Sequence, residues 1–162
     1  MLRLSKLADY AVVVLVRLSH QEGVQTAPGI AASTGIPEPT VAKVLKILAS
    51  AELVASQRGA KGGYRLNRPL AGISVTEVIS AVDGPIALTA CVDGYGSTEC
   101  ESQGLCPMRG RWNPVNAAVQ RAVAAITLAD MQNSIPPMRA GPAIPLGAPE
   151  TSVAPDRRAA AE

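Results

Sequence analysis

The sequence predicts a mainly α-helical fold, in which a winged helix-turn-helix domain with a two-stranded wing precedes a cysteine-bearing loop and a long helix. Three observations lead to this prediction. Two helical patterns meet at a glycine turn around Gly35, and a glycine-rich hairpin with a basic tip follows at residues 57–63. All three cysteines, at positions 91, 100 and 106, lie in one segment without apolar periodicity, which indicates a loop.

Charge is distributed unevenly along the 162 residues. Residues 1–72 hold nine lysines and arginines against four acidic residues, a net charge of +5, whereas residues 73–162 have a net charge of −3. A basic N-terminal half indicates a polyanion as its partner. The chain has no phenylalanine, three tyrosines and one tryptophan, which argues against a protein that stacks single-stranded bases on aromatic side chains.

The cysteines indicate a metal site more than disulfides. No secretory signal precedes them, because the apolar run after Asp9 is too short to span a membrane. We therefore expect a cytoplasmic protein that does not associate with a membrane. In the reducing cytoplasm, clustered thiols more often bind metal or sense redox state than form disulfides.

A first helix is expected over residues 5–20. Ser5 is a suitable N-cap, and apolar residues recur at helical spacing on one face. These residues are Leu4, Leu7, Ala11, Leu15 and Leu18. His20, the only histidine, falls at the end of this helix, where a surface residue that satisfies the helix dipole is expected rather than a metal ligand.

Residues 21–52 predict a helix-turn-helix. Thr26 can cap a short helix with Pro28 in its first turn, and Gly35 supplies the turn to a second helix that begins with two prolines. The buried face of the second helix carries Val41, Val44, Leu45 and Leu48, and its exposed face carries Thr40, Lys43 and Lys46. DNA readers place such a helix in the major groove, although this stretch alone fits an ordinary helical pair with solvated lysines equally well.

The hairpin that follows favours DNA binding. Residues 53–56 and 64–66 predict two short strands, and the glycines between them allow a tight turn. Basic residues gather at the tip, namely Arg58, Lys61 and Arg65. A wing of this kind can place arginine in a minor groove or lysine against phosphates. We expect phosphate contacts from Lys43, Lys46, Lys61 and Arg65, and base-edge contacts from Thr40 and Lys43.

A capping box at Ser74 and Glu77 begins the helix that closes the winged-helix domain, and Gly84 and Pro85 end it. We place the domain at residues 1–85 and the cysteine loop at 86–107. A tail over residues 133–162, rich in proline, alanine and glycine, is predicted to be disordered.

Between loop and tail, residues 108–132 predict one long amphipathic helix. Its apolar stripe carries Val115, Val119, Ala122 and Ile126. A helix beyond a complete domain needs a surface that covers its stripe, and a second copy of the chain is the simplest one. Trp112 is expected to anchor packing where the loop meets this helix.

The order of these features resembles the IscR/NsrR family of bacterial winged-helix regulators. The resemblance covers about residues 1–132 and rests on the wing motif at 58–64, the segments 78–85 and 126–130, the three cysteines and Trp112. Within the family, the chain looks most like the regulator of SUF iron–sulfur assembly. The resemblance implies a homodimer that binds palindromic promoter DNA and holds an iron–sulfur cluster, [2Fe-2S] or [4Fe-4S]. The matching cluster ligands are Cys91, Cys100 and Cys106, and Arg58 matches the wing arginine that enters the minor groove.

Two features depart from the IscR pattern. The gap between the first two cysteines is eight residues, which is longer than usual, and Arg109 stands where a histidine ligand is usual. Because arginine stays protonated, it cannot bind the cluster. In NsrR-like members the fourth ligand is an aspartate near the start of the first helix of the other subunit, and Asp9 stands in the matching place. Glu99 and Glu101 are weaker candidates.

A cluster is favoured over zinc, because structural zinc prefers four ligands in close cysteine pairs and these three thiols are widely spaced. The sequence thus predicts a cluster-sensing transcription regulator of iron–sulfur assembly genes. Alternatives are a nitric-oxide-responsive repressor with the same ligands, an electron-transfer iron–sulfur protein, and a zinc-stabilised interaction module. Nothing indicates an enzyme or a small-molecule substrate, because no nucleophile–base pairing or phosphate-binding loop is present in the sequence.

Overall fold

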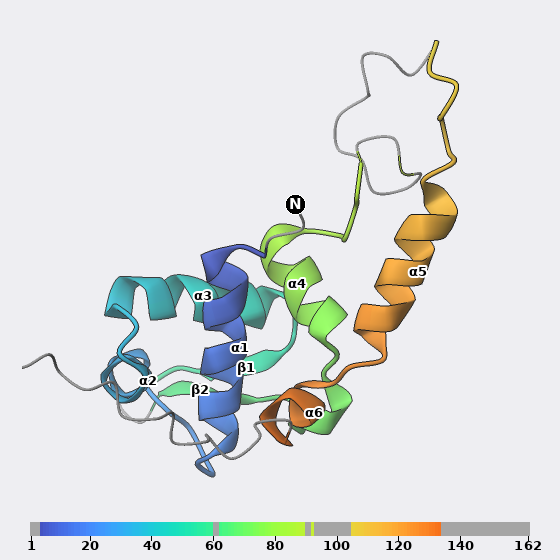
Figure 1. The fold of residues 1–162 in the computed structure, drawn as a ribbon. Coiled ribbons are helices and arrows are strands. Elements are labelled where there is room, and N and C mark those ends of the chain that lie inside the picture. The colour runs from blue at the N-terminus through green and yellow to red at the C-terminus, as the bar shows by residue number, and fades with distance from the viewer. Residues whose placement is uncertain (1–3, 60–61, 90–91, 93–104, 134–162) are drawn as a thin grey trace, which may run out of the picture.

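The computed structural model describes residues 4–59, 62–89, 92 and 105–133 of the chain (Figure 1). Within them, helices α1 to α4 and a two-stranded wing form a winged-helix body, and α5 stands beside this body like an arm (Figure 1). The element bounds are α1 Lys6–Ser19, α2 Ala27–Thr34, α3 Glu38–Ser50, β1 Val54–Gln57, β2 Gly63–Leu66, η1 Leu70–Gly72, α4 Val75–Asp83, α5 Asn113–Ala124 and α6 Leu128–Asn133. The predicted mainly helical winged-helix fold is confirmed.

Helix α1 crosses the core. Its N-cap is Ser5, whose Oγ accepts the N–H of Ala8 at 3.0 Å. The buried residues of α1 are Ala8, Ala11, Val14, Leu15 and Leu18. Leu4 precedes the helix and is 55% exposed, so its predicted place on the buried stripe is wrong. None of the described helices is long and apolar enough to cross a membrane.

The helix-turn-helix forms as predicted. Thr26 caps α2 by accepting the N–H of Gly29 at 3.2 Å. Gly35 ends α2 with a φ of 72°, a left-handed conformation that favours glycine. In α3 the four predicted apolar residues are fully buried, and the helix packs against α1, α2 and α4. Complete burial of each such side chain contributes roughly 1.5–3 kcal/mol.

A capping box starts α4, and its glutamate also forms an ion pair. Glu77 Oε2 accepts the N–H of Ser74 at 2.8 Å, and Ser74 Oγ accepts the N–H of Glu77 at 3.3 Å. The guanidinium of Arg68, in the loop before η1, pairs with the other carboxylate oxygen of Glu77. The hydrogen bond from the Ser74 backbone, supported by the Ser74 hydroxyl and Arg68, lowers the pKa of Glu77.

We expect Glu77→Gln to destabilise the protein at neutral pH and to have a smaller effect in acid. Glutamine keeps a carbonyl oxygen for Ser74 but loses the charge, which costs up to about 1 kcal/mol for an exposed cap and ion pair. Because the folded-state pKa is lowered, the contribution of the carboxylate is complete above the ordinary value of 4.5 and is lost as the pH falls through the folded-state pKa. Urea unfolding of both proteins from about pH 7 to about pH 3 measures this difference. A difference that stays constant over this range contradicts the assignment.

The predicted single helix over 108–132 is two helices. Thr127 Oγ1 accepts the N–H of Asp130 at 3.1 Å, and Asp130 Oδ2 accepts the N–H of Thr127 at 2.9 Å, so a second reciprocal cap starts α6. A backbone hydrogen bond joins Leu128 to Ile73 at 2.9 Å and holds the break against η1. Leu128 is fully buried, and α6 packs against α1 and η1 of the winged-helix body (Figure 1). Helix α5 ends at Ala124, before this contact.

Candidate functional site

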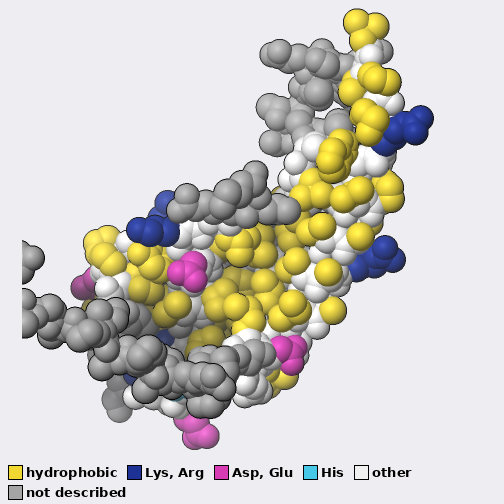
Figure 2. Space-filling model, viewed as in Figure 1, with side chains coloured by type: hydrophobic (Ala, Val, Ile, Leu, Met, Phe, Trp, Pro, Cys, Tyr) yellow, Lys and Arg dark blue, Asp and Glu magenta, His cyan; other side chains and the backbone are white. Residues whose placement is uncertain are grey.

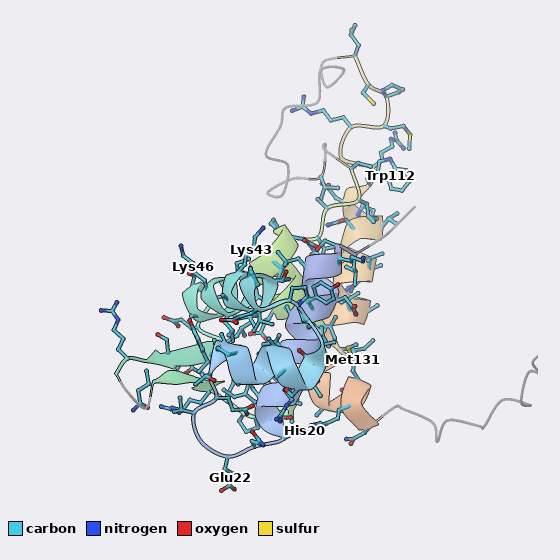
Figure 3. All side chains as sticks on the ribbon, turned by 90° about the vertical axis from the view of Figure 1, so that its left-hand side faces the viewer. His20, Glu22, Lys43, Lys46, Trp112 and Met131 are labelled. Carbon is cyan, nitrogen blue, oxygen red and sulfur yellow. The ribbon has the colours of Figure 1, made fainter. Side chains whose placement is uncertain are left out.

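Helix α3 presents basic side chains to solvent. Lys43 and Lys46 are exposed and project from one side of the helix (Figure 3). Thr40, in the first turn, is half-buried. The opposite side of α3 is fixed in the core, so rotation of the helix would expose its buried aliphatic side chains. The structure therefore keeps these three predicted DNA-binding residues on the accessible part of the second helix of the helix-turn-helix.

The wing places two predicted basic residues in solvent. Strands β1 and β2 pair antiparallel, with Ser56 opposite Tyr64. Arg58 is exposed immediately after β1, and Arg65 is the exposed residue of β2. Lys61 lies outside the described residues.

Gln25 joins the wing to the helical body, a contact that no sequence pattern predicted. Its N–H donates to the carbonyl oxygen of Tyr64 at 2.9 Å, and its own carbonyl oxygen accepts the N–H of Tyr64 at 2.8 Å. Its buried side chain donates from Nε2 to the carbonyl oxygen of Leu18 at 3.1 Å. The wing is thus held against the C-terminal end of α1.

Gly63→Ala is expected to destabilise this junction. A Cβ at residue 63 would lie 2.4 Å from the carbonyl oxygen of Gln25, well inside van der Waals contact. Overpacking of this kind costs about 1–3 kcal/mol. Gly72→Ala is the matched control, because its Cβ would meet the Arg68 side chain at an ordinary 3.6 Å. Urea unfolding compares the two variants, and equal stability would contradict the close approach of the wing to residue 25.

The structure describes one of the three predicted cysteines. Cys106 is half-buried with a free thiol, in the turns that lead into α5. Its carbonyl oxygen accepts the N–H of Arg109 at 3.3 Å. The remaining predicted or weaker ligands on this segment lie outside the described residues, namely Cys91, Glu99, Cys100 and Glu101.

Asp9, the predicted fourth ligand, is exposed in the first turn of α1. It lines a cavity of about 320 Å³ together with Val75, Ile79 and Met131. Within the described part of the chain, no three His, Cys, Asp or Glu side chains lie close enough together to hold a metal ion. A ligand set made only of described residues of one subunit is therefore not present.

The chain that enters the cysteine segment is hydrogen-bonded to α5. Asn116 accepts the N–H of Leu88 through Oδ1 at 3.0 Å and donates from Nδ2 to the carbonyl oxygen of Ile86 at 3.1 Å. Gln120 Nε2 donates to the same carbonyl oxygen at 3.0 Å. At its other end the segment returns to α5 through the turns after Cys106. The sequence did not single out Asn116, although a polar residue next to an apolar stripe is a signal that could have done so.

An apolar surface extends from α4 to α5 (Figure 2). A cavity of about 610 Å³ lies in it, between α4 and the side of α5 that carries Val119 and Val123, and Ile126 lines it just beyond the end of α5. Val115 and Ile126 are 46% and 45% exposed, so the predicted stripe is largely uncovered in one subunit. Trp112, at the N-cap of α5, is 39% exposed, which contradicts its predicted role as a packing anchor within the described chain.

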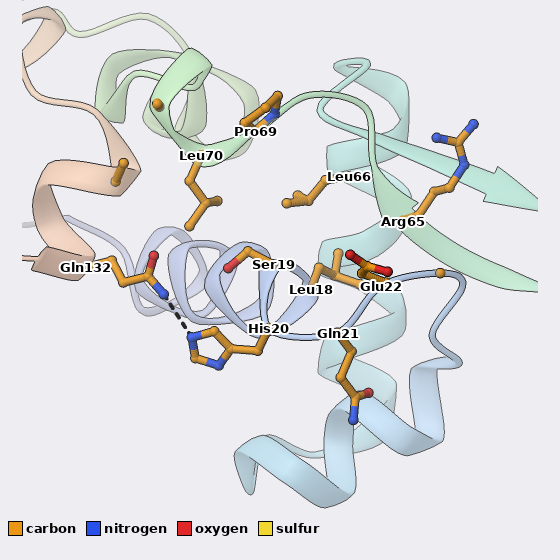
Figure 4. Close-up of a pocket in the computed structure, with 13 residues that line it drawn as sticks. Leu18, Ser19, His20, Gln21, Glu22, Arg65, Leu66, Pro69, Leu70 and Gln132 are labelled. Atoms are coloured by element: carbon orange, nitrogen blue, oxygen red, sulfur yellow. Dashed lines mark hydrogen bonds between the residues drawn. The ribbon is translucent and has the colours of Figure 1, made fainter.

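A second, more polar hollow of about 570 Å³ lies where α1, β2 and α6 meet (Figure 4). His20 forms the C-cap of α1 at its edge and is exposed, as predicted. Its Nε2 lies 2.8 Å from Gln132 Nε2, a hydrogen bond that joins α1 to the last turn of α6. This contact is structural, and the described residues around it hold no pair that suggests catalysis.

Comparison with known sequences matches the chain to a protein family. The model of the Rrf2 family, described as "Iron-dependent Transcriptional regulator", matches residues 4–134. The chain is 33% identical over 132 residues to Rv1287 of Mycobacterium tuberculosis, which bears the name of an HTH-type transcriptional regulator, and the match covers 80% of this chain and 81% of the relative. It is 31% identical over 132 residues to the HTH-type transcriptional regulator IscR of Photobacterium profundum, covering 80% and 75% of the two chains.

Solved structures show the same fold. CymR, described as the global cysteine regulator of B. subtilis, is similar with a TM-score of 0.61 at 27% identity, over 82% of this chain and 98% of that one. The IscR of T. potens is similar with a TM-score of 0.57 at 28% identity, over 82% of this chain and 87% of that one.

Proposed function

We propose that this chain, which belongs to the Rrf2 family of transcriptional regulators, senses an iron–sulfur cluster on its cysteine segment and thereby controls iron–sulfur assembly genes of the SUF or ISC type. Membership of that family confirms that the chain is a transcription regulator and not an enzyme. One observation carries the proposal. Just before the segment that bears the three cysteines, the chain is hydrogen-bonded to α5, and after the segment the chain leads directly into α5. This helix has the uncovered apolar face.

The donor set suits an iron–sulfur cluster. Thiolates are the usual ligands of its irons, and Cys106 is a free, half-buried thiol in a turn rather than part of a disulfide. When bound, the cluster would supply a centre that oxidation or iron loss can alter. The similarity to proteins named IscR, such as those of Photobacterium profundum and T. potens, supports this cofactor, whereas CymR is described as a regulator of cysteine.

The proposed protein is a homodimer. Three residues of α5, Val115, Val119 and Ala122, recur at intervals of four and three, the spacing of a coiled-coil seam, and Ile126 continues this spacing just beyond the helix. Two such faces can cover each other across a two-fold axis. Each subunit would then present one α3 and one wing to one half-site of a palindromic promoter.

The same arrangement supports a ligand from the second copy. Asp9 borders a cavity lined by Val75, Ile79 and Met131, and these three residues also line the larger apolar cavity beside α5. A copy seated on that surface would therefore lie next to Asp9. We assign the fourth cluster position to the partner's Asp9, in place of the arginine at 109 that cannot bind iron.

On DNA, α3 would occupy the major groove, with Thr40 and Lys43 at base edges and with Lys43 and Lys46 near enough to neutralise phosphates. Arg58 would reach the minor groove from the wing, and Arg65 and Lys61 would contact the backbone. The exposure of the four described basic residues supports these roles. The protein would act in the cytoplasm, where its promoter DNA lies.

Anaerobic purification with visible absorption, iron and sulfide analysis tests the cluster. We expect a brown protein with equal amounts of iron and sulfide, and loss of colour in Cys100→Ala and Cys106→Ala. Asp9→Ala should lose its cluster more rapidly than wild type. Leu105→Ala is the matched control, because this side chain is 96% exposed in the same turn and should leave the cluster intact.

A colourless wild-type protein after reconstitution, or one that contains zinc, would remove the cluster from the proposal and leave a DNA-binding regulator. An Asp9→Ala protein that retains its cluster as tightly as wild type would remove only the fourth ligand.

A further inference from the structure

We propose that Asn116 transmits the state of the cysteine segment to α5. This inference rests on the proposed cluster sensing, but every contact that carries it lies in described residues. Both polar atoms of the Asn116 amide bind the incoming chain, which we define as residues 85–89 before the cysteine segment. Oδ1 accepts the Leu88 N–H at 3.0 Å, and Nδ2 donates to the Ile86 carbonyl oxygen at 3.1 Å.

Burial makes these hydrogen bonds important. Asn116 is 2% exposed and is the one residue that α5 buries. A buried amide that loses its partners has no water to replace them, so breaking either bond is unfavourable. Displacement of Leu88 would therefore favour a matching displacement of α5.

Packing alone does not fix the incoming chain. Cavities of about 260 Å³ and 610 Å³ lie between α4 and α5, and Pro85 and Ile86 line both of them. The smaller cavity is also lined by Thr76, whose buried hydroxyl has no hydrogen-bond partner among the described residues. With space on both sides, residues 85–86 can shift once the amide contacts are released.

Asn116 therefore acts as a positioning residue between two parts of the proposed sensor. On one side it holds the chain that enters the cysteine segment. On the other side it belongs to the helix whose apolar face would join two subunits. A change at the cluster that pulls on Leu88 would move α5, and with it the spacing of the two α3 helices.

Asn116→Leu tests this role, with Gln120→Leu as the matched control. Gln120 donates to the same Ile86 carbonyl oxygen, at 3.0 Å, whereas the Leu88 N–H is bound by Asn116. In the cluster-free, full-length protein we expect amide exchange at Leu88 to become roughly tenfold faster in Asn116→Leu, with faster reaction of the thiols with Ellman's reagent. Gln120→Leu should change both rates by less than about twofold. Unchanged rates in Asn116→Leu would overturn the proposal, because the Asn116 amide would then not be what holds Leu88 in place.

The second measurement is the ratio of promoter affinities with and without the cluster. We expect a ratio clearly different from one in wild type and in Gln120→Leu, and a ratio close to one in Asn116→Leu that still holds its cluster. A wild-type ratio of one would overturn the cluster sensing and the transmission together. A normal ratio in Asn116→Leu would overturn the transmission alone.

Discussion

Replacing Val119 with aspartate is expected to separate the subunits and to weaken binding to a palindromic promoter by about 100-fold or more. Val119 is half-buried in the centre of the α5 stripe and lines the 610 Å³ apolar cavity. In a two-fold dimer the charge enters the interface twice, and a buried carboxylate without a partner is strongly unfavourable. Separated subunits also lose the gain in affinity that comes from contacting two half-sites at once. Analytical ultracentrifugation and a DNA titration measure the two effects.

Ala117→Asp is the control for this experiment. Residue 117 is exposed on α5, about half a helical turn away from Val119, so the same charge enters the same helix on its other side. We expect a dimer with normal promoter affinity. A Val119→Asp protein that remains dimeric would place the interface elsewhere, and the uncovered stripe of α5 would then need a different partner.

The helix-turn-helix could be predicted because its boundaries depend on local chemistry. Thr26 caps α2 within three residues of itself, and Gly35 adopts the left-handed conformation that its position requires. The capping box at Ser74 and Glu77 is equally local. Where the sequence carries both the start signal and the stop signal, the predicted and observed elements agree.

The long helix was predicted wrongly although a local signal was present. Thr127 and Asp130 have the spacing of a capping pair, and this pair starts α6 where the apolar stripe suggested continuity. Periodicity alone favours one helix, because Ile126 follows the stripe of α5 in register. The break is then fixed by a tertiary contact, the backbone bond from Leu128 to Ile73, which no sequence pattern shows.

The roles of the two buried polar side chains among the described residues, Gln25 and Asn116, were not predicted, because their partners are set by tertiary contacts. Each side chain satisfies backbone groups outside regular secondary structure or in another element. Gln25 bonds the carbonyl oxygen of Leu18 near the end of α1, and Asn116 bonds the backbone of residues 86 and 88. The cluster ligands present a further difficulty, because the proposed fourth ligand comes from another subunit. Exposed cations such as Lys43 follow directly from helical periodicity, so the exposure of the basic residues was the most predictable feature of the proposed DNA-binding surface.

The double substitution Lys43→Ala, Lys46→Ala is expected to weaken promoter binding by about 100-fold at moderate salt and to flatten its salt dependence. Both ammonium groups are exposed on one side of α3, and each phosphate that a cation neutralises contributes about 0.9 to the slope of log affinity against log salt (Figure 3). Two lysines in each of two subunits should therefore lower the magnitude of that slope by about 3 to 4. Fluorescence anisotropy with a labelled promoter fragment at several salt concentrations measures both quantities.

Two further variants serve as comparisons. Arg121→Ala removes a positive charge outside α3, and Thr40→Ala removes a proposed base-edge contact without changing the charge. Arg121 is exposed on α5 and bonds within its own helix, where Nε donates to the carbonyl oxygen of Ala117 at 3.3 Å, so Arg121→Ala should leave the slope unchanged. Thr40→Ala should keep the slope and reduce the preference for the promoter over other DNA, because a base-edge contact carries sequence information whereas a phosphate contact does not. If the double lysine variant keeps the wild-type slope, α3 does not lie against the phosphates, and the wing with Arg58 and Arg65 becomes the main DNA contact.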